Sequence, residues 1–239
     1  MSEQTALGFD FGDSGDSCEL APFPVTPMTK KARDANDAKV VADAVELPHA
    51  KSTPNYRHIA RTFMSEVALD EHLPWHLAPG DCYHCFSYGE IDQISYIRHL
   101  LKDQRAEYMM IATWAIDTAG VCDLFKWMDD GLIGRLDVWI GDYVRKRHDG
   151  KEYRNLLDGV TARGGKVCCF FNHAKIVVIF GERYDVVLES SANINWNPRS
   201  ENAVITVSSE LAEFYRDVFY KIHPHNKADI PEGWEPWRR

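Results

Sequence analysis

The sequence predicts an α/β fold in which a mixed β-sheet is flanked by helices. Short, wholly apolar runs typical of buried strands alternate with longer segments whose apolar residues recur at the spacing of a helix. The 239 residues are 45% hydrophobic, which is enough for one sizeable core. Because strands that alternate with helices pack in layers, we expect one sheet with helices against its faces.

Helices are predicted where an apolar stripe coincides with a start or stop residue. Ser87 and Glu90 have capping-box spacing ahead of a stripe that runs to Leu101. Gly131 and Gly164 end two further stripes, because glycine suits the residue after a helix C-terminus. The predicted helices cover residues 87–103, 121–131, 153–164 and 209–222.

Strands are predicted for apolar runs that are short and rich in β-branched or aromatic residues. The run 166–180 is interpreted as continuous strand that turns through 181–183 into the next strand. The predicted strands cover residues 108–116, 136–142, 166–180, 184–190 and 201–207.

The two ends of the chain are expected to lie outside the folded domain. Residues 1–50 are rich in Asp, Ser, Gly and Pro, and we interpret them as a flexible acidic extension in which 37–47 has the pattern of a short helix. The domain is predicted to cover 54–225, and 226–239 to be a C-terminal tail.

The charge of the chain limits how it could bind a polyanion. Its formal net charge is −9, so nucleic acid is not attracted to the protein as a whole, and binding to phosphate requires a local basic patch. The N-terminal residues are acidic and lack the apolar stretch of a secretory signal. We therefore expect a cytoplasmic protein with reduced cysteines and no membrane contact.

Polar residues stand two apart in two of the apolar regions. His173 and Lys175 form one such pair, and Ser191 and Asn193 follow the next predicted strand. Because alternate residues of a strand face the same side, each pair is expected to project together. If the two segments are neighbours, four polar side chains converge on one place.

These residue types suit chemistry at phosphorus. His173 can attack as a nucleophile. Lys175, Ser191 and Asn193 can hold the non-bridging oxygens of the transition state. We expect Glu201 behind the histidine, where a carboxylate would fix its tautomer and stabilise its cationic form. Since side chains supply the positive charge, we expect no metal and no other cofactor.

The pattern resembles the phospholipase D superfamily, whose members carry H-x-K, four residues, Asp, and then a G/S-S-x-N segment. The matching residues are HAK at 173–175 and SSAN at 190–193. The Ser-Glu-Asn triplet at 200–202 resembles the small single-motif bacterial nucleases of that superfamily. The resemblance is close over 170–220, and over 80–165 it is a matching order of elements. It implies a phospholipase D-like fold and a metal-independent phosphodiesterase, foremost a nuclease acting on DNA or RNA through a phosphohistidine.

The chain departs from this pattern at Phe180, where the family has its aspartate. One alternative is therefore a catalytically impaired nucleic-acid-binding or regulatory module that retains the fold. Asp185 either replaces the missing carboxylate from across the turn or is a solvated turn residue. A phospholipase is a further alternative, disfavoured because those relatives usually carry two motifs.

The resemblance also implies an assembly. Family members use two H-x-K histidines, one as nucleophile and one as the acid for the leaving oxygen. This chain has one H-x-K that a Ser-x-Asn segment follows, so we expect a C₂ homodimer in which the two copies of His173 face each other. The alternative is a monomer in which His84 or His99 is the acid, although the helical pattern puts His99 on the surface.

Three other features have both a functional and a structural interpretation. A Cys-x-x-Cys with nearby histidines suggests zinc, but Tyr83 and Phe86 indicate a strand that passes into the core. Cys168 and Cys169 are expected in the core, and Asp117 either binds a ligand at a strand end or forms a turn. The zinc candidates are His72, His76, Cys82, His84 and Cys85.

Residues 143–154 concentrate positive charge. They form either a solvated loop or a track for a phosphate backbone, and the nuclease hypothesis uses the second interpretation. The basic residues are Arg145, Lys146, Arg147, Lys151 and Arg154.

Overall fold

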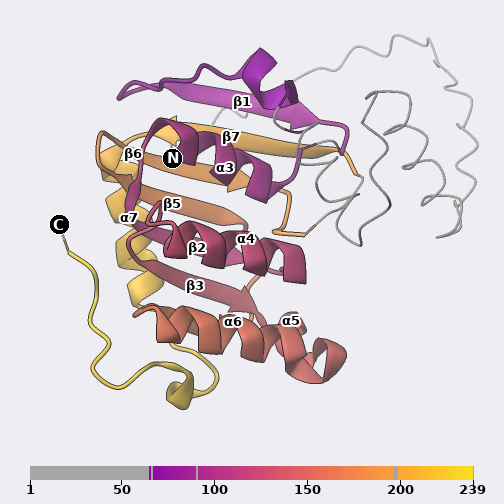
Figure 1. Ribbon diagram of the computed structural model, residues 1–239, viewed down its shortest axis with the longest axis vertical. Helices are drawn as coiled ribbons and strands as arrows, with labels where there is room; N and C mark the ends of the chain where they lie inside the picture. Colours follow the sequence, from indigo (N-terminus) through magenta and orange to yellow (C-terminus); the bar gives the residue numbers. More distant parts are fainter. Residues whose placement is uncertain (1–64, 66, 90, 196–198, 239) are drawn as a thin grey trace, which may run out of the picture. The chain divides into compact units, whose positions relative to one another are not determined.

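A seven-stranded sheet with the order β1-β7-β6-β5-β2-β3-β4 forms the centre of the domain (Figure 1). The computed structural model describes residues 65, 67–89, 91–195 and 199–238, so the predictions for 1–50 lie outside the described residues. β2, β3 and β4 are parallel, and the other neighbouring pairs are antiparallel, which confirms the predicted mixed sheet. The strands are β1 Cys82–Ser87, β2 Ala106–Thr113, β3 Leu136–Gly141, β4 Lys166–Phe170, β5 Ile176–Gly181, β6 Asp185–Ser190 and β7 Glu201–Val207.

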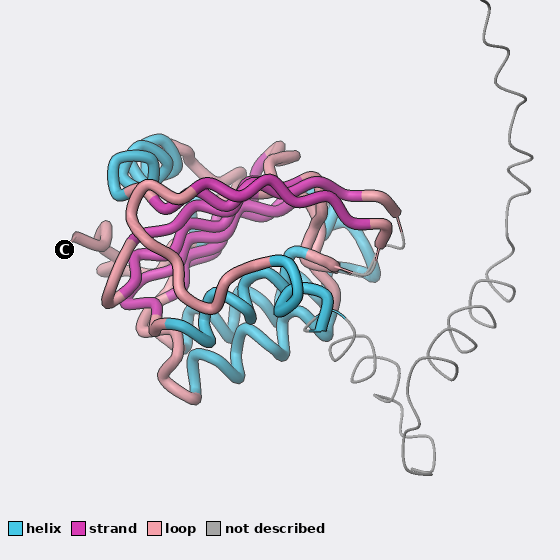
Figure 2. The backbone as a smooth tube through the Cα atoms, turned by 90° about the horizontal axis from the view of Figure 1, so that it is seen from above, coloured by secondary structure: helices cyan, strands magenta, loops and turns pink. Residues whose placement is uncertain are grey.

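Helices cover both faces of this sheet (Figure 2). Apolar residues of α3, α4 and α6 pack with one set of strand residues into a first core, and α7 packs with the alternate set into a second core. None of these helices is long and apolar enough to cross a membrane, within the ranges that the structure describes. The helices are α3 Gln93–Asp103, α4 Thr118–Asp129, α5 Asp142–Lys146, α6 Lys151–Ala162 and α7 Ser209–Tyr220, with single 3₁₀ turns at Arg147–Gly150 and Lys227–Asp229.

The predicted capping box at Ser87 is wrong. Ser87 is the last residue of β1, where it pairs with Glu201, and α3 begins only at Gln93. Asp92 caps the helix instead, because its Oδ1 accepts hydrogen bonds from the Ser95 amide at 2.9 Å and the Ser95 hydroxyl at 2.6 Å.

The run 166–180 is not a continuous strand, because β4 ends at Phe170 and β5 begins at Ile176. Buried Asn172 fixes the connection between them. Its Nδ2 donates to the carbonyl oxygens of Thr113 at 3.1 Å and Trp139 at 3.0 Å, at the ends of β2 and β3, and its Oδ1 accepts from the Ala174 amide at 2.9 Å. The H-x-K triplet therefore lies in a connection anchored to the carboxyl ends of two parallel strands.

Phe180 lies in the second core, away from that connection. Its ring centroid is 5.8 Å from that of Tyr108 and 4.9 Å from that of Trp237, and the Arg216 guanidinium carbon is 5.7 Å from it. Trp237 and Trp234 belong to the predicted C-terminal tail, and the Trp234 ring centroid lies 3.6 Å from the buried ammonium of Lys166. The segment after α7 thus packs against the sheet and contributes to the core.

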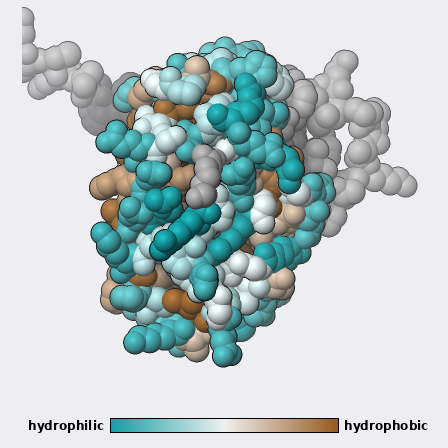
Figure 3. Space-filling view, turned by 90° about the vertical axis from the view of Figure 1, so that its left-hand side faces the viewer, coloured by the Kyte–Doolittle hydropathy of each residue, from teal (hydrophilic) through white to brown (hydrophobic). Residues whose placement is uncertain are grey.

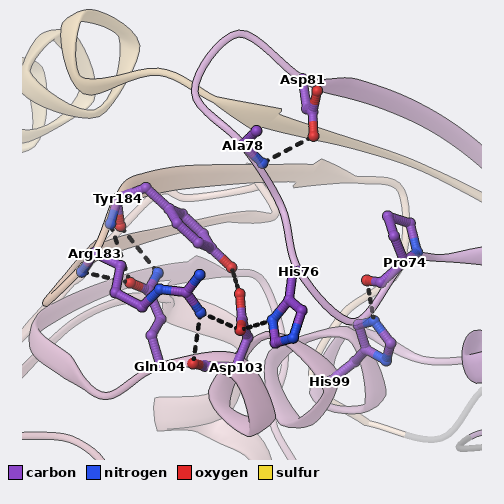
Figure 4. Close-up of polar contacts among 9 residues, drawn as sticks. All are labelled: Pro74, His76, Ala78, Asp81, His99, Asp103, Gln104, Arg183 and Tyr184. Carbon is purple, nitrogen blue, oxygen red and sulfur yellow. Dashed lines mark hydrogen bonds and ion pairs between the residues drawn. The ribbon is translucent and has the colours of Figure 1, made fainter.

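A polar cluster around Asp103 joins three separate segments at the C-terminal end of α3 (Figure 4). The carboxylate is 2% exposed and accepts hydrogen bonds from Tyr184 and Arg183 in the turn between β5 and β6. His76, in the chain before β1, forms a hydrogen bond with the same carboxylate. These contacts fix the end of the sheet opposite the H-x-K connection.

Figure 3 shows the side of the domain on which α7 lies in Figure 1, where hydrophilic residues predominate.

The prediction that His99 lies on the surface is wrong, and the prediction for the Cys-x-x-Cys segment is confirmed only in part. His99 is 5% exposed, because the chain before β1 covers it and its Nε2 lies 3.3 Å from the carbonyl oxygen of Pro74 (Figure 4). The segment is strand β1 and its Tyr83 packs against the first core, but Phe86 is 64% exposed and does not enter the core. Cys82 and Cys85 stand three positions apart in β1 and therefore project from opposite faces of the strand, so this pair does not converge on one ion.

Candidate active site

The H-x-K connection and the chain after β6 together line a surface hollow of about 410 Å³. The two segments are joined by the Ser190 amide, which donates to the Lys175 carbonyl oxygen at 2.9 Å. The structure therefore brings His173, Lys175 and Ser191 together, as the sequence predicts. The lining residues are His173, Ala174, Lys175, Ile176, Glu189, Ser190 and Ser191.

His173 and Lys175 are in direct contact. The Lys175 Nζ donates to the carbonyl oxygen of His173 at 2.8 Å and lies 3.1 Å from its Nδ1. Strand alternation does not produce this proximity, because both residues precede β5; the bend that Asn172 holds does. The imidazole is exposed to solvent while the lysine is buried, so an incoming group meets the ring first.

Burial lowers the pKa of Lys175, and the negative charge of Glu201 partly opposes this. An ammonium held out of water interacts more strongly with an anion than a solvated one does, because the effective dielectric constant is lower. The hollow is therefore suited to a group with negatively charged oxygens.

Ser191 and Asn193 are held by different strands. The Ser191 hydroxyl donates to the Glu201 carboxylate and accepts from the Asn202 amide at 3.0 Å, which ties it to the start of β7. The Asn193 Oδ1 accepts from the Trp114 amide at 3.2 Å, after the end of β2. With its oxygen in that bond, the amide group of Asn193 keeps two N–H donors for another acceptor. The orienting role predicted for Glu201 toward His173 stays a prediction.

Two residues of the hollow and its wall have no signal in the sequence. The Trp114 ring centroid lies 5.6 Å from that of His173, yet Trp114 belongs to an apolar run that indicates only a buried strand. Glu189 lines the hollow at the end of β6 and accepts a hydrogen bond from the Tyr215 hydroxyl of α7. Burial, followed by that hydrogen bond, raises the pKa of Tyr215, so the phenol stays protonated as the donor.

The predicted basic segment 143–154 adjoins Trp114. It is helical, so the interpretation of this segment as a loop is wrong. Tyr143 of α5 stacks on Trp114 with ring centroids 4.5 Å apart, and the Arg147 guanidinium carbon lies 6.0 Å from the Tyr143 ring. Lys146 forms an ion pair with Asp142. All the basic residues named for this segment are exposed: Arg145, Lys146, Arg147, Lys151 and Arg154.

Three further candidates have structural positions. Asp117 is the N-cap of α4, where its Oδ1 accepts from the Gly120 amide at 2.8 Å. Cys168 and Cys169 are buried in β4, as predicted for core residues, and burial raises their pKa values to about 12 and about 11. A thiol with so high a pKa is a poor nucleophile at neutral pH.

A second His-Ala-Lys triplet occurs at 49–51, outside the described residues. No Ser-x-Asn segment follows it at the spacing found after 173–175. A third H-x-K, with Asn as its middle residue, stands at 225–227, and no Ser-x-Asn segment follows it in the sequence either. The chain therefore has three H-x-K triplets but one complete motif pair.

No protein-family model and no curated protein matches the sequence. Among solved structures, the chain is similar to Nuc of Salmonella typhimurium, described as a phospholipase D family member, with a TM-score of 0.43, 16% identity and coverage of 59% of this chain and 91% of that one. It is similar to NucT of Helicobacter pylori with a TM-score of 0.44, 16% identity and coverage of 59% and 95%. It is similar to phosphatidylserine synthase of Haemophilus influenzae with a TM-score of 0.47, 14% identity and coverage of 86% and 57%.

All three TM-scores are below 0.5, so what the site can do is argued from the residues of the hollow alone. The described domain has a mixed sheet flanked by helices, with the H-x-K connection at 173–175 beside the S-x-N segment at 191–193. The predicted α/β fold, a mixed sheet flanked by helices, is confirmed.

Proposed function

We propose that this protein is a metal-independent phosphodiesterase that cleaves DNA or RNA through a covalent phosphohistidine at His173. The observation that carries the proposal is the contact between the exposed imidazole of His173 and the buried ammonium of Lys175 in one hollow. A nucleophile and a cation at this separation can act on the same phosphate group.

The first step forms a bond between a ring nitrogen of His173 and phosphorus and breaks the bond to the leaving oxygen. Lys175 holds Nδ1 and a backbone carbonyl before substrate binds, and in the complex it turns to a non-bridging oxygen. The Asn193 amide supplies further donors to these oxygens, and the Ser191 hydroxyl adds one when it turns from Glu201 to the phosphate. These donors stabilise the charge that builds up in the transition state. Glu201 sets the direction of the Ser191 hydroxyl and is placed to compensate the charge of Lys175.

The leaving oxygen needs a proton, and the second step needs a base that activates water against the phosphohistidine. We assign both roles to His173 of a second copy in a C₂ homodimer, which would surround the phosphate with two sets of the same side chains. His99 does not compete for this role because it is buried at the other end of α3.

Nucleic acid is preferred as substrate because the exposed basic residues of α5 and the turn after it adjoin the wall of the hollow. They supply the local positive charge that a protein of net charge −9 requires for binding a phosphate backbone.

The test is cleavage of labelled single- and double-stranded DNA and RNA in excess EDTA. The proposal predicts cleavage that survives EDTA and that vanadate inhibits, because vanadate mimics the bound phosphoryl group. Activity that disappears in EDTA and returns with Mg²⁺ or Zn²⁺ would refute the mechanism. Cleavage of a phospholipid headgroup with none of nucleic acid would refute the substrate class.

A further inference from the structure

Two exposed aromatic rings lie close to His173. Phe171 precedes it by two residues and is 83% exposed, and Tyr143 is 42% exposed. Each ring is supported by a second one: Phe171 meets the His225 ring edge-on at 4.5 Å, and Tyr143 stacks on Trp114 at 4.5 Å. Supported rings of this kind present flat apolar surface without losing much side-chain freedom on binding.

We propose that Tyr143 and Phe171 stack on unpaired nucleobases, so that the substrate of this site is single-stranded nucleic acid. The inference rests on the proposed function, since it names the class of strand whose phosphate enters the hollow. Every nucleobase has a flat face, so stacking binds a strand without selecting its sequence.

The connection to the reacting group is continuous in space. Tyr143 contacts Trp114, and Trp114 lies against His173, so a base on Tyr143 lies a short distance from the phosphate that His173 would attack. Phe171 is attached to the same connection as His173, which Asn172 fixes to β2 and β3. Both rings therefore keep a set position relative to the nucleophile.

The charges beside the rings fit a single strand. Arg145 and Arg147 are exposed on the segment that carries Tyr143, and the Arg147 guanidinium lies 6.0 Å from the Tyr143 ring. A basic track next to aromatic rings is the combination that binds unpaired strands. In a duplex the faces of the bases are covered by their neighbours, and the rings would reach only the sugar–phosphate backbone.

The experiment measures binding by the full-length His173→Ala chain, so that no probe is consumed. The probes are oligothymidylate, oligouridylate, an abasic DNA strand and a DNA duplex, all of one length. We expect oligothymidylate, oligouridylate or both to bind roughly 10-fold or more tightly than the abasic strand, which has the same phosphates but no bases. Whichever strand binds above the abasic level identifies the sugar.

Substitutions assign the effect to the rings. Tyr143→Ala and Phe171→Ala should each weaken binding of the preferred strand by roughly 5- to 50-fold and leave abasic binding nearly unchanged. Tyr143→Phe, which keeps the ring, should retain the affinity. Trp75→Ala is the matched control, because Trp75 is 52% exposed and contacts His99 and Lys102 near the other end of the domain.

Equal affinity for the abasic strand, or tighter binding of the duplex, would overturn the inference. If the wild-type protein cleaves nucleic acid in EDTA but binding shows either of these two results, this inference is refuted and the proposed function stands. A protein that cleaves no nucleic acid loses the proposed function, whatever its binding.

Discussion

The ammonium of Lys175 lies 3.1 Å from Nδ1 of His173 and 2.8 Å from the carbonyl oxygen of the same residue. The two residues thus form one unit with separable tasks. His173→Ala should lower kcat by roughly 10⁴-fold with nearly unchanged substrate affinity, because it removes the nucleophile and leaves the cation. Lys175→Ala should weaken both binding and turnover. Steady-state kinetics with direct binding measurements separates the two, and wild-type turnover by His173→Ala would contradict the assignment.

The alkaline limit of activity should follow Lys175. Burial lowers the pKa of this ammonium, so its charge is lost at a lower pH than that of an ordinary lysine. We expect kcat to decline on the alkaline side below the range in which free lysine titrates. Lys175→Arg keeps a charged group at high pH, so whatever activity it retains should lack this decline. If kcat declines at the same alkaline pH in the wild type and in Lys175→Arg, the group that titrates is not Lys175.

Acid stability should depend on Asp103. Burial raises the pKa of this carboxyl, but hydrogen bonds from Tyr184 and His76 and the charge of Arg183 outweigh it, so the pKa lies below its usual value. A depressed pKa gives stability that is present above the pKa of the unfolded chain and is lost as the pH falls through the folded value. Urea unfolding across acidic pH should show this loss in the wild type.

Asp103→Asn should be less stable by about 1–3 kcal/mol at neutral pH, and its stability should fall less in acid, because the group that titrates is gone. Asp217→Asn is the matched control, since Asp217 is 60% exposed and pairs with its neighbour Arg216. Equal acid sensitivity of Asp103→Asn and the wild type would sink this prediction.

Phe180→Asp should destabilise the protein without raising its activity. The ring is 2% exposed among Tyr108, Trp237 and Arg216, so the change removes apolar packing and buries a carboxylate. We expect a loss of at least about 3 kcal/mol in the free energy of unfolding. Phe180→Leu, which stays apolar, should lose much less. A large rise in kcat at unchanged stability would show instead that Phe180 marks an impaired site.

Mixed dimers test the shared site. If the two copies of His173 act on one phosphate, a heterodimer of wild-type and His173→Ala chains should be almost inactive, and the variant should inhibit the wild type on subunit exchange. Full activity of the wild-type chain in a purified heterodimer, or an active monomer by light scattering, would refute this assembly. His84→Ala and His49→Ala, measured alongside, show whether either of these histidines is the acid instead.

The sequence predicts the order of elements well because the apolar periodicity is local. The prediction of a continuous strand fails at residues 171–175. Asn172, which follows β4, donates hydrogen bonds to carbonyl groups 59 and 33 residues earlier in the chain. No local pattern records such partners. His99 is misassigned for a similar reason: helical spacing gives its direction on α3, but not that the chain before β1 covers that face.

The site shows the same division. The residue types of His173, Lys175, Ser191 and Asn193 indicate the chemistry, and their motif spacing indicates that they converge. Neither the residue types nor the spacing predicts that Trp114 lies beside His173. Trp114 is indistinguishable in sequence from any aromatic residue at the end of a buried strand.

The contact between the rings of Phe180 and Trp237 has a consequence for the evolution of these two positions. A ring at position 180 is accommodated because a second ring, contributed from almost the last residue of the chain, covers it. An aspartate there would be buried beneath an indole, so the two positions should change together during evolution. Homologues with aspartate at position 180 are then expected to lack a residue equivalent to Trp237 or to carry a small polar residue in its place.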